Sequence, residues 1–134
     1  MNKNLQKIIF FSLLITPSKA IAASDTDCFL AANINTIGMA GTVCADKLIV
    51  SRAMLLPRIK INKYWIKHNK KKYYFGKHKN GRRLIFTGQI TNFNNLFNNK
   101  QKFNADISYW DTSSAKSMVQ MFKNAKKFNR NLKS

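Results

Sequence analysis

The pattern of apolar and polar residues predicts a helix followed by short strands in the middle of the chain. In residues 45–56, apolar side chains recur at spacings of three and four, which is typical of an amphipathic helix, and Pro57 is expected to end it. Between residues 59 and 86, apolar residues alternate with charged ones. This alternation predicts antiparallel strands, with turns at residues 68–71 and 79–81.

From Thr91 onward the pattern repeats at an interval of 25 residues. When residues 91–109 are aligned with 116–134, the identical pairs are Phe97 and Phe122, Asn99 and Asn124, Lys102 and Lys127, Phe103 and Phe128, and Asn104 and Asn129. Apolar character is also kept at three further pairs of positions. One coil of this size cannot bury its apolar side alone, so the period predicts a solenoid of stacked units.

Within the second unit, residues 115–118 are expected to form a short strand and residues 119–128 a helical or turn-like return. The side chains of Asn124 and Asn129 are expected to bond the backbone of tight turns. The residues predicted to form the core of the repeat are Phe93, Leu96, Phe97, Phe103, Ile107, Trp110, Met118, Met121, Phe122, Phe128 and Leu132.

The first 22 residues have the pattern of a signal peptide. Two early lysines precede the apolar run 8–15, and Ala20 and Ala22 stand where a signal peptidase reads small residues. Cleavage is expected after Ala22, or alternatively after Ala23. The apolar run is short for a membrane span. We therefore expect an exported protein, secreted or held at the cell surface, without a retained membrane anchor.

Cys28 and Cys44 are the only cysteines in the sequence. In an exported chain of this length such a pair most often forms a disulfide. The surrounding residues, 23–42, are expected to form loops with short extended pieces. The alternatives are a catalytic thiol or a zinc site, but both histidines lie far away in the sequence, and zinc needs more ligands than two cysteines.

The composition is strongly basic, with 24 Lys and Arg against 5 Asp and no Glu. The densest cluster consists of Lys67, Lys70, Lys71, Lys72, Lys77, Lys79, Arg82 and Arg83, set around Tyr73, Tyr74 and Phe75. Basic residues interleaved with aromatics are typical of surfaces that bind single-stranded nucleic acid. The same pattern also fits a solvated strand face that keeps edge strands from pairing, and codon bias in an A+T-rich genome gives a similar composition.

The residues available for catalysis are few. They are Asp25, Asp27, Asp46, Asp106, Asp111, His68 and His78, and no pair or triad among them has a suggestive spacing. Asp106 and Asp111 lie at repeat turns, where Asp most often caps backbone amides. Calcium binding there would need further oxygen ligands. We expect no enzymatic activity, no cofactor, no metal and no small-molecule substrate.

The stretch LFNNKQKFNADISYWDTSSAKSMVQMFKNAKKFNRNL, residues 96–132, resembles the repeat of BspA-type leucine-rich-repeat surface proteins, also called the mycoplasma lipoprotein-associated repeat. The positions that match the repeat pattern are Phe97, Phe103, Asn104, Asp106, Ile107, Ser108, Trp110, Asp111, Thr112, Ser113, Met118, Met121, Phe122, Ala125, Phe128, Asn129 and Leu132. Lys133 and Asn131 depart from it, since Ser and Asp are expected there. The resemblance implies a secreted or surface-displayed scaffold that binds other molecules, in some members matrix proteins or neighbouring cells.

Together these observations predict an α+β protein with three parts: a signal peptide (1–22), a disulfide-containing cap region with a helix and basic antiparallel strands (23–90), and about two repeat units of a leucine-rich-repeat-like solenoid (91–134), the last incomplete. A solenoid generally needs three or more units. Either the cap region helps to bury the coils, or the chain is the front end of a longer array, which we favour. The predicted function is a non-catalytic binding or adhesion scaffold for a protein or glycan. The alternative is binding of nucleic acid or an anionic cell or membrane surface through the basic cluster.

Overall fold

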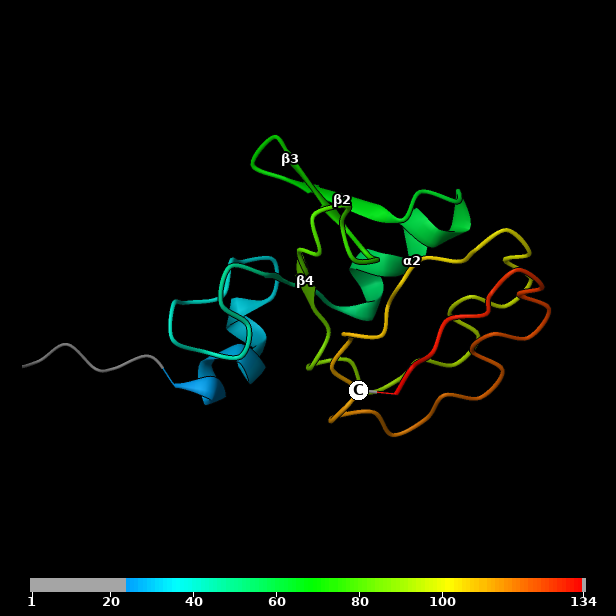
Figure 1. Ribbon diagram of the computed structural model, residues 1–134. Helices are drawn as coiled ribbons and strands as arrows, with labels where there is room; N and C mark the ends of the chain where they lie inside the picture. Colours follow the sequence, from blue (N-terminus) through cyan, green and yellow to red (C-terminus); the bar gives the residue numbers. More distant parts are fainter. Residues whose placement is uncertain (1–23, 134) are drawn as a thin grey trace, which may run out of the picture.

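The computed structural model of the protein describes residues 24–133 (Figure 1). The predicted signal peptide and its cleavage point lie outside these residues. The elements are the 3-10 helices η2 (Asp25–Phe29) and η3 (Ala31–Asn33), strand β1 (Leu48–Ile49), helix α2 (Arg52–Lys60), and strands β2 (Trp65–His68), β3 (Lys71–Tyr74) and β4 (Ile85–Phe86). From residue 87 to residue 133 the chain runs through turns and short extended pieces.

The helix predicted for residues 45–56 is wrong at both ends. Leu48 and Ile49 form strand β1, and helix α2 begins after Ser51 and continues through Pro57 to Lys60. A proline inside a helix costs about 3 kcal/mol, because it removes a hydrogen bond and clashes with the preceding turn. The burial of Leu55 and Ile59 on one side of α2 offsets this cost.

The prediction of a hairpin with its turn at residues 68–71 is confirmed, because β2 and β3 pair in antiparallel register. The two connecting residues, Asn69 and Lys70, have φ values of 44° and 64°. Positive φ at both central residues is the geometry that matches the twist of a two-residue hairpin. The antiparallel prediction fails for the third strand, because β4 pairs with β1 in parallel.

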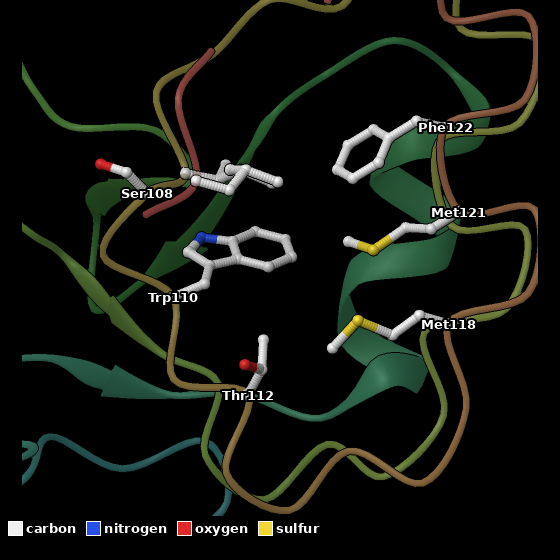
Figure 2. A pocket seen from close by; sticks show the side chains of 8 residues that line it. Ser108, Trp110, Thr112, Met118, Met121 and Phe122 are labelled. Carbon is white, nitrogen blue, oxygen red and sulfur yellow. The ribbon is translucent and has the colours of Figure 1, made fainter. Parts of the chain in front are cut away.

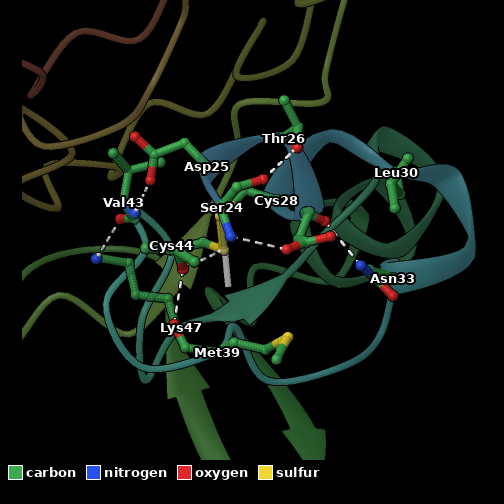
Figure 3. The surroundings of a disulfide bond; sticks show 12 residues. Ser24, Asp25, Thr26, Cys28, Leu30, Asn33, Met39, Val43, Cys44 and Lys47 are labelled. Atoms are coloured by element: carbon green, nitrogen blue, oxygen red, sulfur yellow. Dashed lines mark hydrogen bonds between the residues drawn. A yellow bond between two sulfur atoms is a disulfide. The ribbon is translucent and has the colours of Figure 1, made fainter. Parts of the chain in front are cut away.

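The segment before β1 is fastened by the disulfide between Cys28 and Cys44, which confirms that prediction (Figure 3). Both sulfur-bearing side chains are buried beside Ile49 and Phe86. The carboxylate of Asp25 accepts a hydrogen bond from the backbone N–H of Val43, 2.8 Å away. The disulfide therefore holds η2 against the small parallel sheet formed by β1 and β4.

The two 25-residue units lie against each other in register (Figure 1). Asn92 and Ser117, which are 25 residues apart, form a parallel bridge. Backbone N–H groups of the first unit donate to carbonyl oxygens of the second at four successive places, Phe93 to Ser117, Asn95 to Val119, Phe97 to Met121, and Asn99 to Lys123. The backbones of the two units are therefore linked much as neighbouring parallel strands are.

Phenylalanine rings stack both between the units and within each unit. The Phe97 and Phe122 rings are 5.6 Å apart and nearly parallel, and the Phe103 and Phe128 rings are 5.5 Å apart. Within the units, Phe97 stacks on Phe103 at 3.9 Å and Phe122 on Phe128 at 4.1 Å. The four rings form a block that joins the two units through apolar contact.

Two residues predicted to lie in the core are instead exposed. Met118 retains 43% of its accessible surface and Leu132 retains 45%, while Phe122 and Phe128 are only partly buried. Each of these residues belongs to the second unit, which packs against the first on one side and faces solvent on the other within residues 24–133. The remaining predicted core residues are buried: Phe93, Leu96, Phe97, Phe103, Ile107, Trp110 and Met121.

Candidate functional site

Residues 24–133 contain no group of three or more His, Cys, Asp or Glu side chains placed to hold a metal ion. No helix in the same part of the chain is long and apolar enough to cross a membrane.

The two carboxylates of the first repeat unit bond to nearby groups. Asp106 accepts hydrogen bonds from the hydroxyl and the backbone N–H of Ser108, at 2.6 and 3.1 Å. These bonds, with a smaller contribution from Lys77 at 3.6 Å, hold the pKa of Asp106 below its usual value. Asp111 accepts the backbone N–H of Ser113 at 2.8 Å. Both carboxylates thus act as turn caps.

An apolar cavity of about 190 Å³ opens beside the second repeat unit (Figure 2). Trp110 forms one wall, and Met118, Met121 and Phe122 point toward it from the opposite side. Ser108 and Thr112 flank the indole ring and add hydroxyl groups at the edges. The cavity thus places exposed apolar side chains of the repeat next to polar ones.

The position of this cavity follows from the repeat. The Trp110 ring packs on Phe93 and Phe97, with centroids 6.3 and 5.8 Å apart. The residues 25 positions after these two are Met118 and Phe122, and both line the cavity. The cavity therefore lies, one unit further along, where a side chain equivalent to Trp110 would pack.

The eight predicted basic residues are all exposed, but the structure divides them among different surfaces. In the hairpin, Lys67 pairs directly with Lys72, while Lys71 pairs with His68 on the opposite face. That opposite face turns toward the core and toward the disulfide segment, where His68 contacts Asn35 at 3.2 Å. Lys70 occupies the turn.

The remaining basic residues follow the hairpin. Lys77 forms an ion pair with Asp106, and Lys79 lies beside His78 at the wall of a second cavity. Arg83 lies near Lys47, whose pKa is lowered mainly by burial and further by repulsion from Arg83. The predicted cluster is therefore at least two separate basic surfaces rather than one patch.

The prediction that aromatic residues of this cluster offer faces for base stacking is wrong for two of the three. Phe75 is fully buried and Tyr73 nearly so, because alternate residues of β3 and its continuation point into the core. Only Tyr74 remains partly exposed.

A basic face runs along the outer side of the hairpin and into the second cavity. We define it by Trp65, Lys67, Lys72 and Tyr74, with Lys77 and Lys79 at the cavity. Trp65 carries two cations, the guanidinium of Arg58 at 4.3 Å and the ammonium of Lys72 at 4.4 Å from the ring centroid. Tyr74 pairs with Trp65 across the hairpin and lines the cavity of about 320 Å³.

The sequence reasoning missed Arg58 and Trp65 as members of this surface. Arg58 falls between the helix that was expected to end at Pro57 and the strands that were expected from residue 59, whereas α2 carries it. Trp65 had a usable signal, since a two-residue turn at Asn69 and Lys70 fixes the register that places it beside Lys72.

Part of the chain matches a family model. Residues 73–134 match the model described as "Mycoplasma protein of unknown function, DUF285", a segment that begins in β3 and includes both repeat units. Neither the curated proteins nor the solved structures show a match to the chain.

Proposed function

We propose that the protein is an exported, non-catalytic repeat protein that serves as a binding scaffold for a protein or glycan, secreted or at the cell surface. In this proposal, residues 91–133 form two units of a leucine-rich-repeat-like solenoid, and the preceding region caps them. The observation that carries the proposal is the in-register stacking of the two units. Architectures of this kind present extended surfaces for binding.

The composition of the second unit supports the same proposal. Met118, which lines the cavity opposite Trp110, and its neighbour Val119 are both exposed. Exposed apolar groups bordered by polar ones are typical of interaction surfaces. The match of residues 73–134 to a mycoplasma family supports a surface repeat protein of the BspA type.

Export is tested in the producing cells with an antibody raised against the purified protein. We expect mass spectrometry to find a mature chain that begins at Ala23 or Ser24. Protease added to intact cells should degrade any cell-associated protein. An unprocessed chain that is protected from protease until the cells are broken would contradict export.

Binding is tested with oxidised mature protein on an array of immobilised matrix proteins and glycans. We expect Val119→Asp, and separately Met118→Asp, to reduce the signal at the array component that the unaltered protein binds. Val43→Asp is the matched control, because Val43 is 50% exposed and Val119 59% exposed, and Val43 lies in the disulfide segment. Binding that survives Val119→Asp and Met118→Asp would rule out the repeat surface.

A further inference from the structure

Lys67 and Lys72 face each other directly across the hairpin, and both are exposed. Like charges at directly opposed positions destabilise an antiparallel pair. Within residues 24–133, Lys77–Asp106 is the single ion pair, so no carboxylate there compensates the two hairpin lysines. An external anion at this position would remove the repulsion.

The basic face extends beyond the hairpin to the second cavity, which Lys77 and Lys79 line. Alternate residues of a strand share one face, so Trp65 and Lys67 of β2 lie on the same side as Lys72 and Tyr74 of β3. Tyr74 continues this face into the second cavity, where its ring lies 5.3 Å from that of His78. The basic face thus runs from Lys67 and Lys72, past Trp65 and Tyr74, to a concave site that Lys77 and Lys79 line.

We propose that the basic face binds a sulfated polysaccharide. One sugar ring occupies the cavity and packs against the side chains of Tyr64, Tyr74 and His78 that line it. Sulfate groups of neighbouring rings contact Lys67 and Lys72 at one end and Lys79 at the other. The cavity of about 320 Å³ is at the lower end of the size range of small-ligand pockets, which suits a single ring.

The geometry favours this ligand over two other polyanions. Binding of single strands relies on open aromatic faces, but Tyr73 and Phe75 are buried and Trp65 is covered by cations. A DNA duplex is too wide to enter the cavity. A flexible chain with single rings and regularly spaced charges fits both the cavity and the rest of the basic face.

The residues of the hairpin also argue against insertion into a membrane. Between residues 63 and 83 the structure has no large hydrophobic side chain that is exposed. Peripheral membrane elements normally bury such side chains at the lipid boundary. The inference depends on the proposed function only for export, and it uses a surface other than the apolar side of the second repeat unit.

The test measures binding of purified, oxidised mature protein to immobilised heparin, with chemically desulfated heparin as the reference ligand. We expect Lys67→Ser/Lys72→Ser to weaken heparin binding by about tenfold or more, and binding of the unaltered protein to fall steeply with salt. The control is Lys126→Ser/Lys127→Ser, which removes the same charge from exposed positions of the repeat. We expect this control to lose about threefold or less.

A second double variant, Lys77→Ser/Lys79→Ser, tests the cavity end independently of the hairpin, and circular dichroism verifies that each variant is folded. Equal losses in the Lys126/Lys127 control would overturn the proposal, because net charge alone would then explain binding. Binding to desulfated heparin, duplex DNA or phosphatidylserine vesicles as tight as to heparin would also overturn it. Loss of heparin binding leaves the repeat scaffold proposal intact, since that is tested at Val119 and Met118.

Discussion

The indole nitrogen of Trp110 donates a hydrogen bond of 2.9 Å to the carbonyl oxygen of Phe75. Trp110 belongs to the first repeat unit and Phe75 directly follows β3, the second strand of the hairpin, so this bond joins the hairpin to the repeat. The hydroxyl of Tyr109 donates to the same oxygen at 2.8 Å. Tyr109 and Trp110 therefore bond the repeat to the end of the hairpin, in addition to their apolar packing.

The shared acceptor leads to a prediction of non-additivity. Tyr109→Phe leaves the Phe75 oxygen bonded to Trp110, so it should cost only about 0.5–1.5 kcal/mol of unfolding free energy. Trp110→Phe should cost more, because it also removes part of a buried ring. The double variant leaves a buried carbonyl without a partner and should exceed the sum of the single losses by about 1 kcal/mol. Urea unfolding of the four proteins measures this coupling, and strictly additive losses would contradict it.

Gly76 gives a second prediction at the same junction. A Cβ at this position would lie 2.8 Å from the Cβ of Ala105 and 3.1 Å from the backbone nitrogen of Asp106. Gly76→Ala should therefore destabilise the protein by about 1–3 kcal/mol through overpacking. Adding Ala105→Gly removes the nearest clash and should restore part of the loss in thermal unfolding. A variant as stable as the unaltered protein would show that the hairpin and the repeat do not pack this closely.

The disulfide is predicted to contribute about 3 kcal/mol, because it closes a loop of 16 residues in the unfolded chain. Cys28→Ser/Cys44→Ser should lower the urea midpoint accordingly, and the non-reduced mature protein should contain no titratable thiol. The two sulfur-bearing side chains also pack against Ile49 and Phe86, so the substitutions should weaken these apolar contacts as well. Two free thiols in the native protein would contradict the prediction.

Tyr109 should limit the stability of the protein at alkaline pH. Burial raises the pKa of its hydroxyl from 10.0 to about 12. The folded state therefore favours the neutral phenol, a contribution that is complete below the unfolded pKa of 10.0 and is lost as the pH rises to about 12. Unfolding free energies measured across this range should fall less steeply in Tyr109→Phe than in the unaltered protein. Equal slopes would show that Tyr109 ionises freely in the folded state.

The sequence predicted local elements better than the pairing of segments that are distant in the chain. The hairpin followed from alternation and a turn expected at residues 68–71, and the disulfide followed from two cysteines in a chain expected to be exported. The parallel pairing of β4 with β1 was missed because Leu48 and Ile85 are far apart in sequence and nothing local states the direction of their pairing. The three-to-four spacing in residues 45–56 was misleading, because periodicity alone cannot tell whether a short run of buried apolar residues, here Leu48 to Val50, belongs to a strand or to a helix.

For the candidate surfaces, the sequence predicted which residues take part but not which side of the hairpin or repeat each side chain faces. The basic residues were identified correctly as exposed. Their division between two faces required the register of the hairpin. The spacing of the repeat predicted which residues are apolar, yet Met118 and Leu132 are exposed because burial depends on whether a further layer covers the second unit.

Several asparagines occupy positions where the backbone has an unusual conformation. Among residues 24–133, nine non-glycine residues have positive φ, and six of these are asparagines. Asn99 and Asn124, 25 positions apart, have φ values of 59° and 57°, and the side-chain amide of Asn124 donates to the Asn99 oxygen at 2.9 Å. Asparagine tolerates this left-handed conformation better than most other side chains. The backbone conformation therefore explains why asparagine suits these two positions.

The conformation of Asn124 therefore predicts an unusual order of substitutions. Asn124→Gly should change the unfolding free energy by about 0.5 kcal/mol or less, because glycine adopts positive φ freely and only an exposed hydrogen bond is lost. Asn124→Val should cost about 1–2 kcal/mol, since a branched side chain is strained there. Lys126→Val is the control, an exposed position in the same unit without positive φ. If Asn124→Val is no more destabilising in thermal unfolding than Lys126→Val, the turn does not impose the left-handed backbone that aligns the two units.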